Sequence, residues 1–137
     1  MKKIFKGAII ILVIFSITQI NAQTDTINFT LTSEGLVTLG QEVNVLSTLI
    51  KKGDTLIWDQ QIEKGVNTNT FTIVSRSEDW DQKKSSGTIT FNMVIEGYNS
   101  EFILTGEKKN LSAHLIIKMS NTEKKEVLFK IDNITYQ

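Results

Sequence analysis

The sequence of 137 residues contains neither cysteine nor proline. The absence of cysteine excludes disulfide bonds, catalysis by a thiol and metal sites built from cysteine. It also excludes a lipid-anchored lipoprotein, because no cysteine can carry the lipid. The absence of proline, which averages about 5% of residues, is a bias of composition. A chain of this length can bury a core without disulfide staples.

An excess of charge of one sign is also lacking, because 15 lysine and arginine residues balance 15 aspartate and glutamate residues. The chain has no basic block of the kind that neutralises nucleic-acid phosphates. We therefore expect no nucleic acid among its partners. The one long apolar run lies near the N-terminus, so we expect no stable membrane span after it.

The first 22 residues have the three-part layout of a cleavable secretory signal peptide. Three lysines come first, an apolar run of about eleven residues follows, and Ala22 supplies a small residue for cleavage. An uncleaved membrane anchor would need roughly 20 apolar residues. We predict that residues 1–22 are removed, that Gln23 becomes the N-terminus, and that the protein is periplasmic or extracellular. The mature chain then has 12 basic and 15 acidic residues, a net charge near −3.

Residues 23–137 are predicted to form a single antiparallel β domain. Apolar and polar residues alternate in several segments, as in strands that bury one face. The short connections between these segments favour antiparallel neighbours. We expect an all-β, meander-rich domain of about eight or nine strands, with a β-sandwich favoured over a small up-and-down barrel.

Segment 39–52 permits two interpretations. Four apolar residues recur at helical spacing, and Gly53 could end a helix; the four are Leu39, Val43, Leu46 and Ile50. However, β-branched residues have modest helix propensity, and Val43, Val45 and Leu49 also fit an alternating pattern. We therefore favour a strand over a helix for this segment.

The familiar catalytic motifs are missing. The sequence has no G-x-S-x-G, S-x-x-K or H-E-x-x-H motif and no phosphate-binding glycine loop. His114 is the only histidine, and it lies on the polar side of a predicted strand. No context typical of a catalytic triad surrounds it. We interpret His114 as an exposed strand residue and expect neither an enzyme nor a bound cofactor or metal.

The stretch 75–87, SRSEDWDQKKSSG, interrupts the alternation and gathers Glu78, Asp79 and Asp81 around Trp80. The carboxylates could bind calcium, but Lys83 stands where an oxygen ligand is needed. They could also act as acid and base on a sugar, but no second carboxylate cluster faces them. The favoured interpretation is a solvated connection of about a dozen residues between sheets.

The two tryptophans have different expected roles. Trp80 is either an anchor folded over the end of the core or a contact for a partner. In the second case Glu78, Asp79 and Asp81 would belong to the same contact. Trp58 shares a face with Leu56 and is assigned to the core.

These observations leave three classes of function. The first is an exported non-enzymatic binding or interaction protein, such as an inhibitor, an assembly factor or an accessory subunit, with an unknown protein partner. The second is a barrel-shaped carrier of a small apolar ligand, which the inward positions Phe91, Met93, Leu115 and Phe129 would line. The third and weakest is a hydrolase that uses the carboxylates of residues 78–81. We expect the first.

Overall fold

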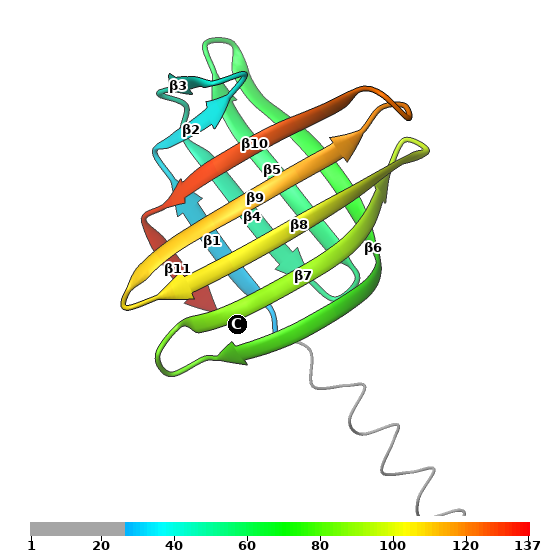
Figure 1. Ribbon diagram of the computed structural model, residues 1–137. Coiled ribbons are helices and arrows are strands. Elements are labelled where there is room, and N and C mark those ends of the chain that lie inside the picture. The colour runs from blue at the N-terminus through cyan, green and yellow to red at the C-terminus, as the bar shows by residue number, and fades with distance from the viewer. Residues whose placement is uncertain (1–26) are drawn as a thin grey trace, which may run out of the picture.

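The computed structural model describes residues 27–137, which form eleven β-strands (Figure 1). The predicted signal peptide and Gln23 lie outside the described residues. The strands are β1 (Phe29–Ser33), β2 (Gly35–Thr38), β3 (Gln41–Val43), β4 (Ser47–Lys52), β5 (Thr55–Ile62), β6 (Gly65–Asp81), β7 (Ser86–Ile95), β8 (Tyr98–Glu107), β9 (Asn110–Lys118), β10 (Lys124–Ile131) and β11 (Asn133–Tyr136).

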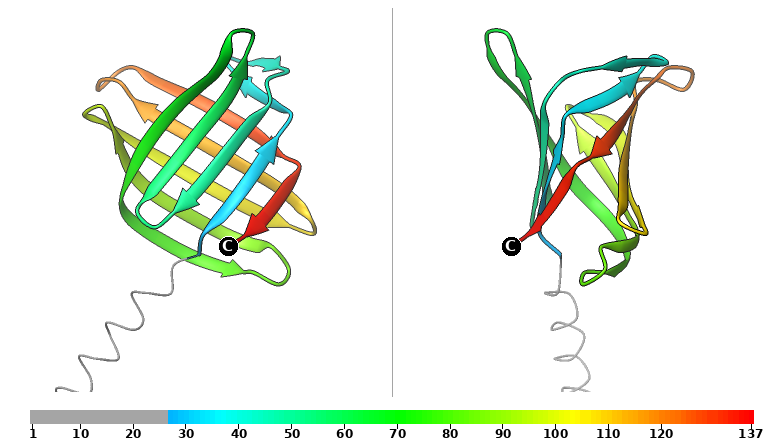
Figure 2. Two further views of the ribbon diagram at one scale, coloured as in Figure 1. Left: turned by 180° about the vertical axis from the view of Figure 1, so that it is seen from behind. Right: turned by 90° about the vertical axis from the view of Figure 1, so that its left-hand side faces the viewer.

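All eleven strands belong to one antiparallel sheet, in the order β11-β1-β4-β5-β6-β7-β8-β9-β10-β2-β3. The sheet curls into a half-barrel, so that β1, β4 and β5 face β8, β9 and β10 across a common interior (Figures 1 and 2). The prediction of an all-β antiparallel domain is confirmed. The strands number eleven, against the eight or nine that the sequence indicated.

Two corners explain part of this difference. Only Glu34 separates β1 from β2, and only Asp132 separates β10 from β11. β1 pairs with β11 and β2 pairs with β10, so two long segments of the chain turn the corner together. The backbone N–H of Glu34 donates to Asp132 Oδ2 over 2.8 Å, and the N–H of Asp132 donates to the carbonyl of Thr32 over 2.8 Å.

Aromatic side chains join the two halves of the sheet in the core. Trp58 of β5 meets Phe129 of β10 edge to face, with ring centroids 5.2 Å apart. Phe29 of β1 stacks with Phe91 of β7 at 6.4 Å. The indole Nε1 of Trp58 donates to Ser47 Oγ over 3.1 Å, which satisfies its only polar atom. The assignment of Trp58 to the core is confirmed.

Segment 39–52 contains strands, as expected, and the helical alternative is wrong. β3 and β4 occupy most of it. Leu39 and Gly40 adopt positive φ angles of 53° and 73°, which turn the chain between β2 and β3. The four apolar residues at helical spacing therefore lie in two strands, in the turn before them and in the connection between them.

The interpretation of 75–87 as a long connection is wrong. β6 continues through this stretch to Asp81, and only residues 82–85 separate it from β7. A β-bulge between Ile73 and Ser75 places Val74 on the exposed side and shifts the alternation by one residue. The inward positions after the bulge are Arg76, Glu78 and Trp80. Because of this shift, the alternation of apolar and polar residues is broken in the sequence although the strand is continuous.

Candidate functional site

Lys51 marks the candidate site, because its side chain is buried with 0% of its surface exposed. It ends the inward row of β4, after Ser47 and Leu49, at a position where the alternation of the strand calls for an apolar residue. A buried charge is costly unless it is paired, so such a lysine requires an explanation.

β6 brings two more charged side chains to the same end of the interior. The bulge turns Arg76 and Glu78 inward, and Arg76 pairs in register with Phe91 of β7. Lys51, Arg76 and Glu78, with Asn28 and Asp54 beside them, form what we call the charged cluster. Asn28 immediately precedes β1, and Asp54 lies in the turn between β4 and β5.

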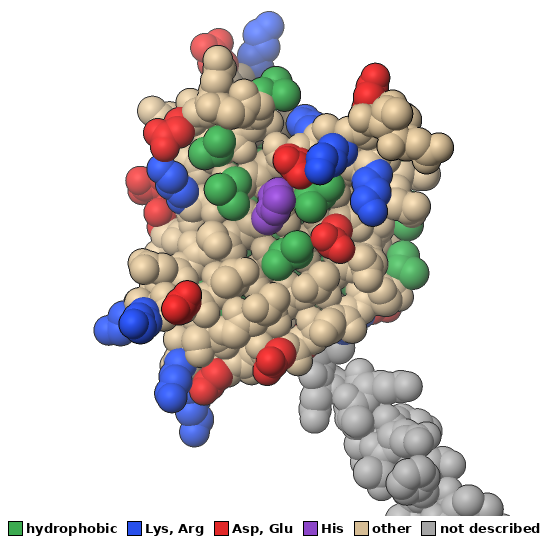
Figure 3. Space-filling view, viewed as in Figure 1, with side chains coloured by type: hydrophobic (Ala, Val, Ile, Leu, Met, Phe, Trp, Pro, Cys, Tyr) green, Lys and Arg blue, Asp and Glu red, His purple; other side chains and the backbone are tan. Residues whose placement is uncertain are grey.

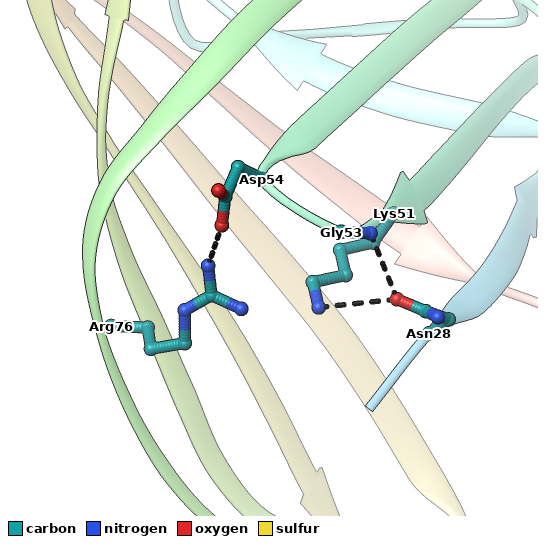
Figure 4. A network of polar contacts seen from close by, with 5 residues as sticks. All are labelled: Asn28, Lys51, Gly53, Asp54 and Arg76. Atoms are coloured by element: carbon teal, nitrogen blue, oxygen red, sulfur yellow. Dashed lines mark hydrogen bonds and ion pairs between the residues drawn. The ribbon is translucent and has the colours of Figure 1, made fainter. Parts of the chain in front are cut away.

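Few protein contacts hold the charged cluster (Figure 4). Lys51 Nζ donates to Asn28 Oδ1 over 3.3 Å, and the same oxygen accepts the backbone N–H of Gly53 over 3.0 Å. Lys51 Nζ also lies 5.7 Å from the ring centroid of Phe91, within reach of a cation–π interaction. Arg76 Nη2 forms an ion pair with Asp54 Oδ1 at the rim.

Two polar atoms of the charged cluster are left without partners among the described residues. Arg76 Nη1 and Glu78 Oε1 are both buried, and neither makes a hydrogen bond. Buried polar groups are normally satisfied, and each exception calls for a reason. The charged cluster that contains Lys51 therefore offers one unused donor and one unused acceptor.

Burial lowers the pKa of Lys51 below the ordinary lysine value of 10.5, and the positive charge of Arg76 lowers it further. The carboxylates of Glu78 and Asp54 act in the opposite direction but do not compensate. The surroundings of Lys51 thus disfavour its positive charge. An additional anion close to Lys51 and Arg76 would relieve this imbalance.

The four residues singled out from the sequence do not form one group. They alternate along β6, so Glu78 and Trp80 point inward while Asp79 and Asp81 are exposed on the outer face. Asp81 Oδ1 accepts the backbone N–H groups of Lys83 and Lys84, which shapes the turn to β7. Contact with a partner through Trp80, Glu78, Asp79 and Asp81 stays a prediction.

Trp80 packs against the core near the end of the half-barrel. Its Nε1 donates to the hydroxyl of Tyr136 over 2.9 Å, and that hydroxyl lies 2.7 Å from Ser85 Oγ. Gly106 of β8 leaves the necessary room, because a Cβ there would lie 2.8 Å from Trp80 Cη2. The indole thereby ties the β6–β7 hairpin to β8 and β11.

His114 lies on the outer face of β9, as expected. It is opposite Ile103 of β8 and Leu128 of β10, and its Nε2 is 3.9 Å from Glu126 Oε1. Figure 3 shows the histidine among hydrophobic side chains on this face. These neighbours provide neither a nucleophile nor a second acid in contact with His114.

The sequence patterns did not indicate Lys51 or Arg76 as site residues. A signal existed for Lys51, because the alternation of Ser47 and Leu49 reaches it directly. Arg76 had no such signal, since its inward direction depends on the bulge. Within residues 27–137, no group of three metal-ligating side chains occurs. The same residues include no helix of the length and apolar character needed to cross a membrane.

No family model, no curated protein and no solved structure matches this chain.

Proposed function

We propose that this chain is an exported, non-enzymatic binding protein that takes a small organic anion into the charged cluster. The observation that carries the proposal is the burial of Lys51 at the same end of the interior as Arg76 Nη1 and Glu78 Oε1, two buried atoms without hydrogen-bond partners within residues 27–137. Proteins rarely keep such groups in a core, where apolar residues pack more favourably. Buried charged groups with unused hydrogen-bonding atoms are candidates for functional sites.

The ligand that fits is a carboxylate with a hydrogen-bond donor next to it. Its carboxylate would accept from Lys51 Nζ and Arg76 Nη1, because charge-assisted hydrogen bonds to these groups are the strong ones. A neighbouring hydroxyl or ammonium group would donate to Glu78 Oε1. A 2-hydroxy acid or an amino acid has this arrangement of groups.

The site has a route to solvent through Arg76. The Arg76 side chain is 23% exposed, and its partner Asp54 is 76% exposed at the rim. Asp54 can therefore leave Arg76 without breaking the core. An incoming carboxylate would replace Asp54 as the partner of Arg76, so the ion pair would open when the ligand binds.

We also propose that the half-barrel works as a small closed barrel with this site at one end. The support is the connectivity, because β1 continues into β2 and β10 into β11 while these segments pair with each other. A barrel leaves no free sheet edge along its wall and surrounds its interior. The middle of the interior is filled by rings such as Trp58 and Phe129, so the proposal does not extend to an apolar carrier.

The proposal is tested by thermal unfolding in the presence of propionate, lactate, alanine or inorganic phosphate. A ligand that binds only the folded state raises the Tm as its concentration rises. We expect lactate or alanine to raise the Tm more than propionate, and we expect Lys51→Met to abolish the difference. Lys52→Met is the matched control, because Lys52 is the exposed neighbour on the same strand. Equal shifts in both variants would contradict the proposal.

A further inference from the structure

The β5–β6 hairpin has a free edge that the proposed function does not use. Figure 2 shows this hairpin projecting beyond the rest of the half-barrel. Residues 65–70 of β6 pair with β5 on one side, but the pairing of β6 with β7 begins only at Thr72. The other side of this segment therefore presents backbone groups that no described strand pairs with.

This edge lacks the devices that usually protect exposed strands. Lysine, proline and inward-pointing charges commonly block strand edges. Residues 65–75, GVNTNTFTIVS, contain no charged residue, and the chain contains no proline. Val66 on this edge is 57% exposed, and Ile62, which ends β5 just before the hairpin turn, is 53% exposed. The edge is suited to pairing with another strand.

We propose that a second copy of this chain pairs with β6 along residues 66–70, as an antiparallel dimer around a two-fold axis at Thr68. In this register Thr68 lies opposite its own copy, Val66 lies opposite Thr70, and Asn67 lies opposite Asn69. One face of the new ladder then consists of β-branched pairs, which stabilise adjacent strands. The other face brings side-chain amides together, which can exchange hydrogen bonds.

The neutrality of the edge is the argument for a second copy as the partner. Like charges directly opposite one another would destabilise a two-fold pair, and this segment brings none together. An isologous contact of this kind closes at two copies.

A charge placed on the two-fold axis tests the proposal. Thr68→Lys would oppose two ammonium groups across the dimer, yet it keeps the hairpin, because Thr68 faces Asp59 of β5. Thr48→Lys is the matched control, because Thr48 of β4 faces the same Asp59 from the other side. We expect the wild type and Thr48→Lys to dimerise in sedimentation velocity between about 5 and about 500 µM. Thr68→Lys should remain a single copy.

A second measurement does not depend on charge. Because the chain has no cysteine, Thr68→Cys introduces a single thiol. Opposed residues of paired strands lie about 4.5–5.5 Å apart at Cα, within the range that a disulfide spans. We expect mild oxidation to link Thr68→Cys into a covalent dimer and to leave Thr48→Cys monomeric.

Three results would overturn the dimer: a wild type that stays a single copy at the highest concentration, equal association of Thr68→Lys and the wild type, or assembly beyond two copies. None of these results bears on the charged cluster. Its proposed ligand-binding residues lie at the end of β4 and in the second half of β6, whereas the dimer involves the first half of β6. The two proposals can therefore fail separately.

Discussion

At the scale of single residues, Lys51 is the one charged residue among residues 27–137 that is fully buried. Its burial therefore needs an explanation. Within residues 27–137 its ammonium makes one hydrogen bond, at 3.3 Å, although an ammonium group has three donors. Isolated buried charges are tolerated where they serve a function and are otherwise replaced by apolar residues. A lysine kept only for stability would be expected to have a close carboxylate partner.

Replacing Lys51 with methionine should therefore stabilise the protein. Methionine has a similar volume and no charge to desolvate, and even the exchange of whole buried ion pairs for apolar residues of similar volume is often neutral or stabilising by about 1–4 kcal/mol. Urea unfolding at pH 7 measures the difference. Lys52→Met, on the exposed side of the same strand, should change stability by less than about 0.5 kcal/mol. A large loss of stability in Lys51→Met would show that Lys51 has a structural role.

The advantage of Lys51→Met should shrink as the pH rises. Burial and Arg76 lower the pKa of Lys51 in the folded state, so near the ordinary value of 10.5 the unfolded chain binds more protons than the folded one. Stability then rises with pH in this window, and the cost of the buried charge is full only below the lowered pKa. Unfolding of the wild type and the variant, each at pH 7 and pH 10, measures the change. A constant difference would contradict the shift.

Trp80 is the second residue with a testable role. Its half-buried indole and its hydrogen bond to Tyr136 predict that Trp80→Ala loses about 2–4 kcal/mol, while Tyr136→Phe loses about 1 kcal/mol. Val74→Ala, at an exposed apolar position of the same strand, is the control. Urea unfolding decides the matter. A stability unchanged in Trp80→Ala would instead favour the predicted contact with a partner.

At the scale of elements, the bulge in β6 determines which side chains enter the interior. The alternation before it places Phe71 and Ile73 inward, and the alternation after it places Arg76, Glu78 and Trp80 inward. Sequence patterns detect a strand by its period of two, so one additional residue appears as a break. This is why the strands around the segment could be predicted while its own structure, and with it Arg76, could not.

The β6–β7 hairpin requires glycine at position 87, because of the backbone conformation there and the close approach of β6. Gly87 has φ 122°, and a Cβ there would lie 2.1 Å from the carbonyl oxygen of Asp79. We expect Gly87→Ala to lose about 3 kcal/mol or more, because backbone strain and a steric clash both contribute. Gly97 in the β7–β8 turn has φ 84° and no atom within 4 Å of a Cβ. Gly97→Ala should lose only about 1–2 kcal/mol, as unfolding measurements can compare.

At the scale of the whole molecule, the sequence predicted the all-β class of fold and the antiparallel arrangement of its strands. Alternation identified the inward residues Phe91, Met93, Leu115 and Phe129, all of which are buried. It could not predict how the sheet curls, because the corners at Glu34 and Asp132 depend on hydrogen bonds between segments about 100 residues apart. Long-range pairing of this kind leaves no local pattern.

Above all, we propose that the protein holds a small organic anion at Lys51 and Arg76. Native mass spectrometry of the protein, purified from the exported fraction without detergent, tests it most directly. We predict an additional mass on the wild type and on Lys52→Met that denaturation releases, and its absence from Lys51→Met. The mass of the bare chain in all three, or an additional mass retained by Lys51→Met, would contradict the claim.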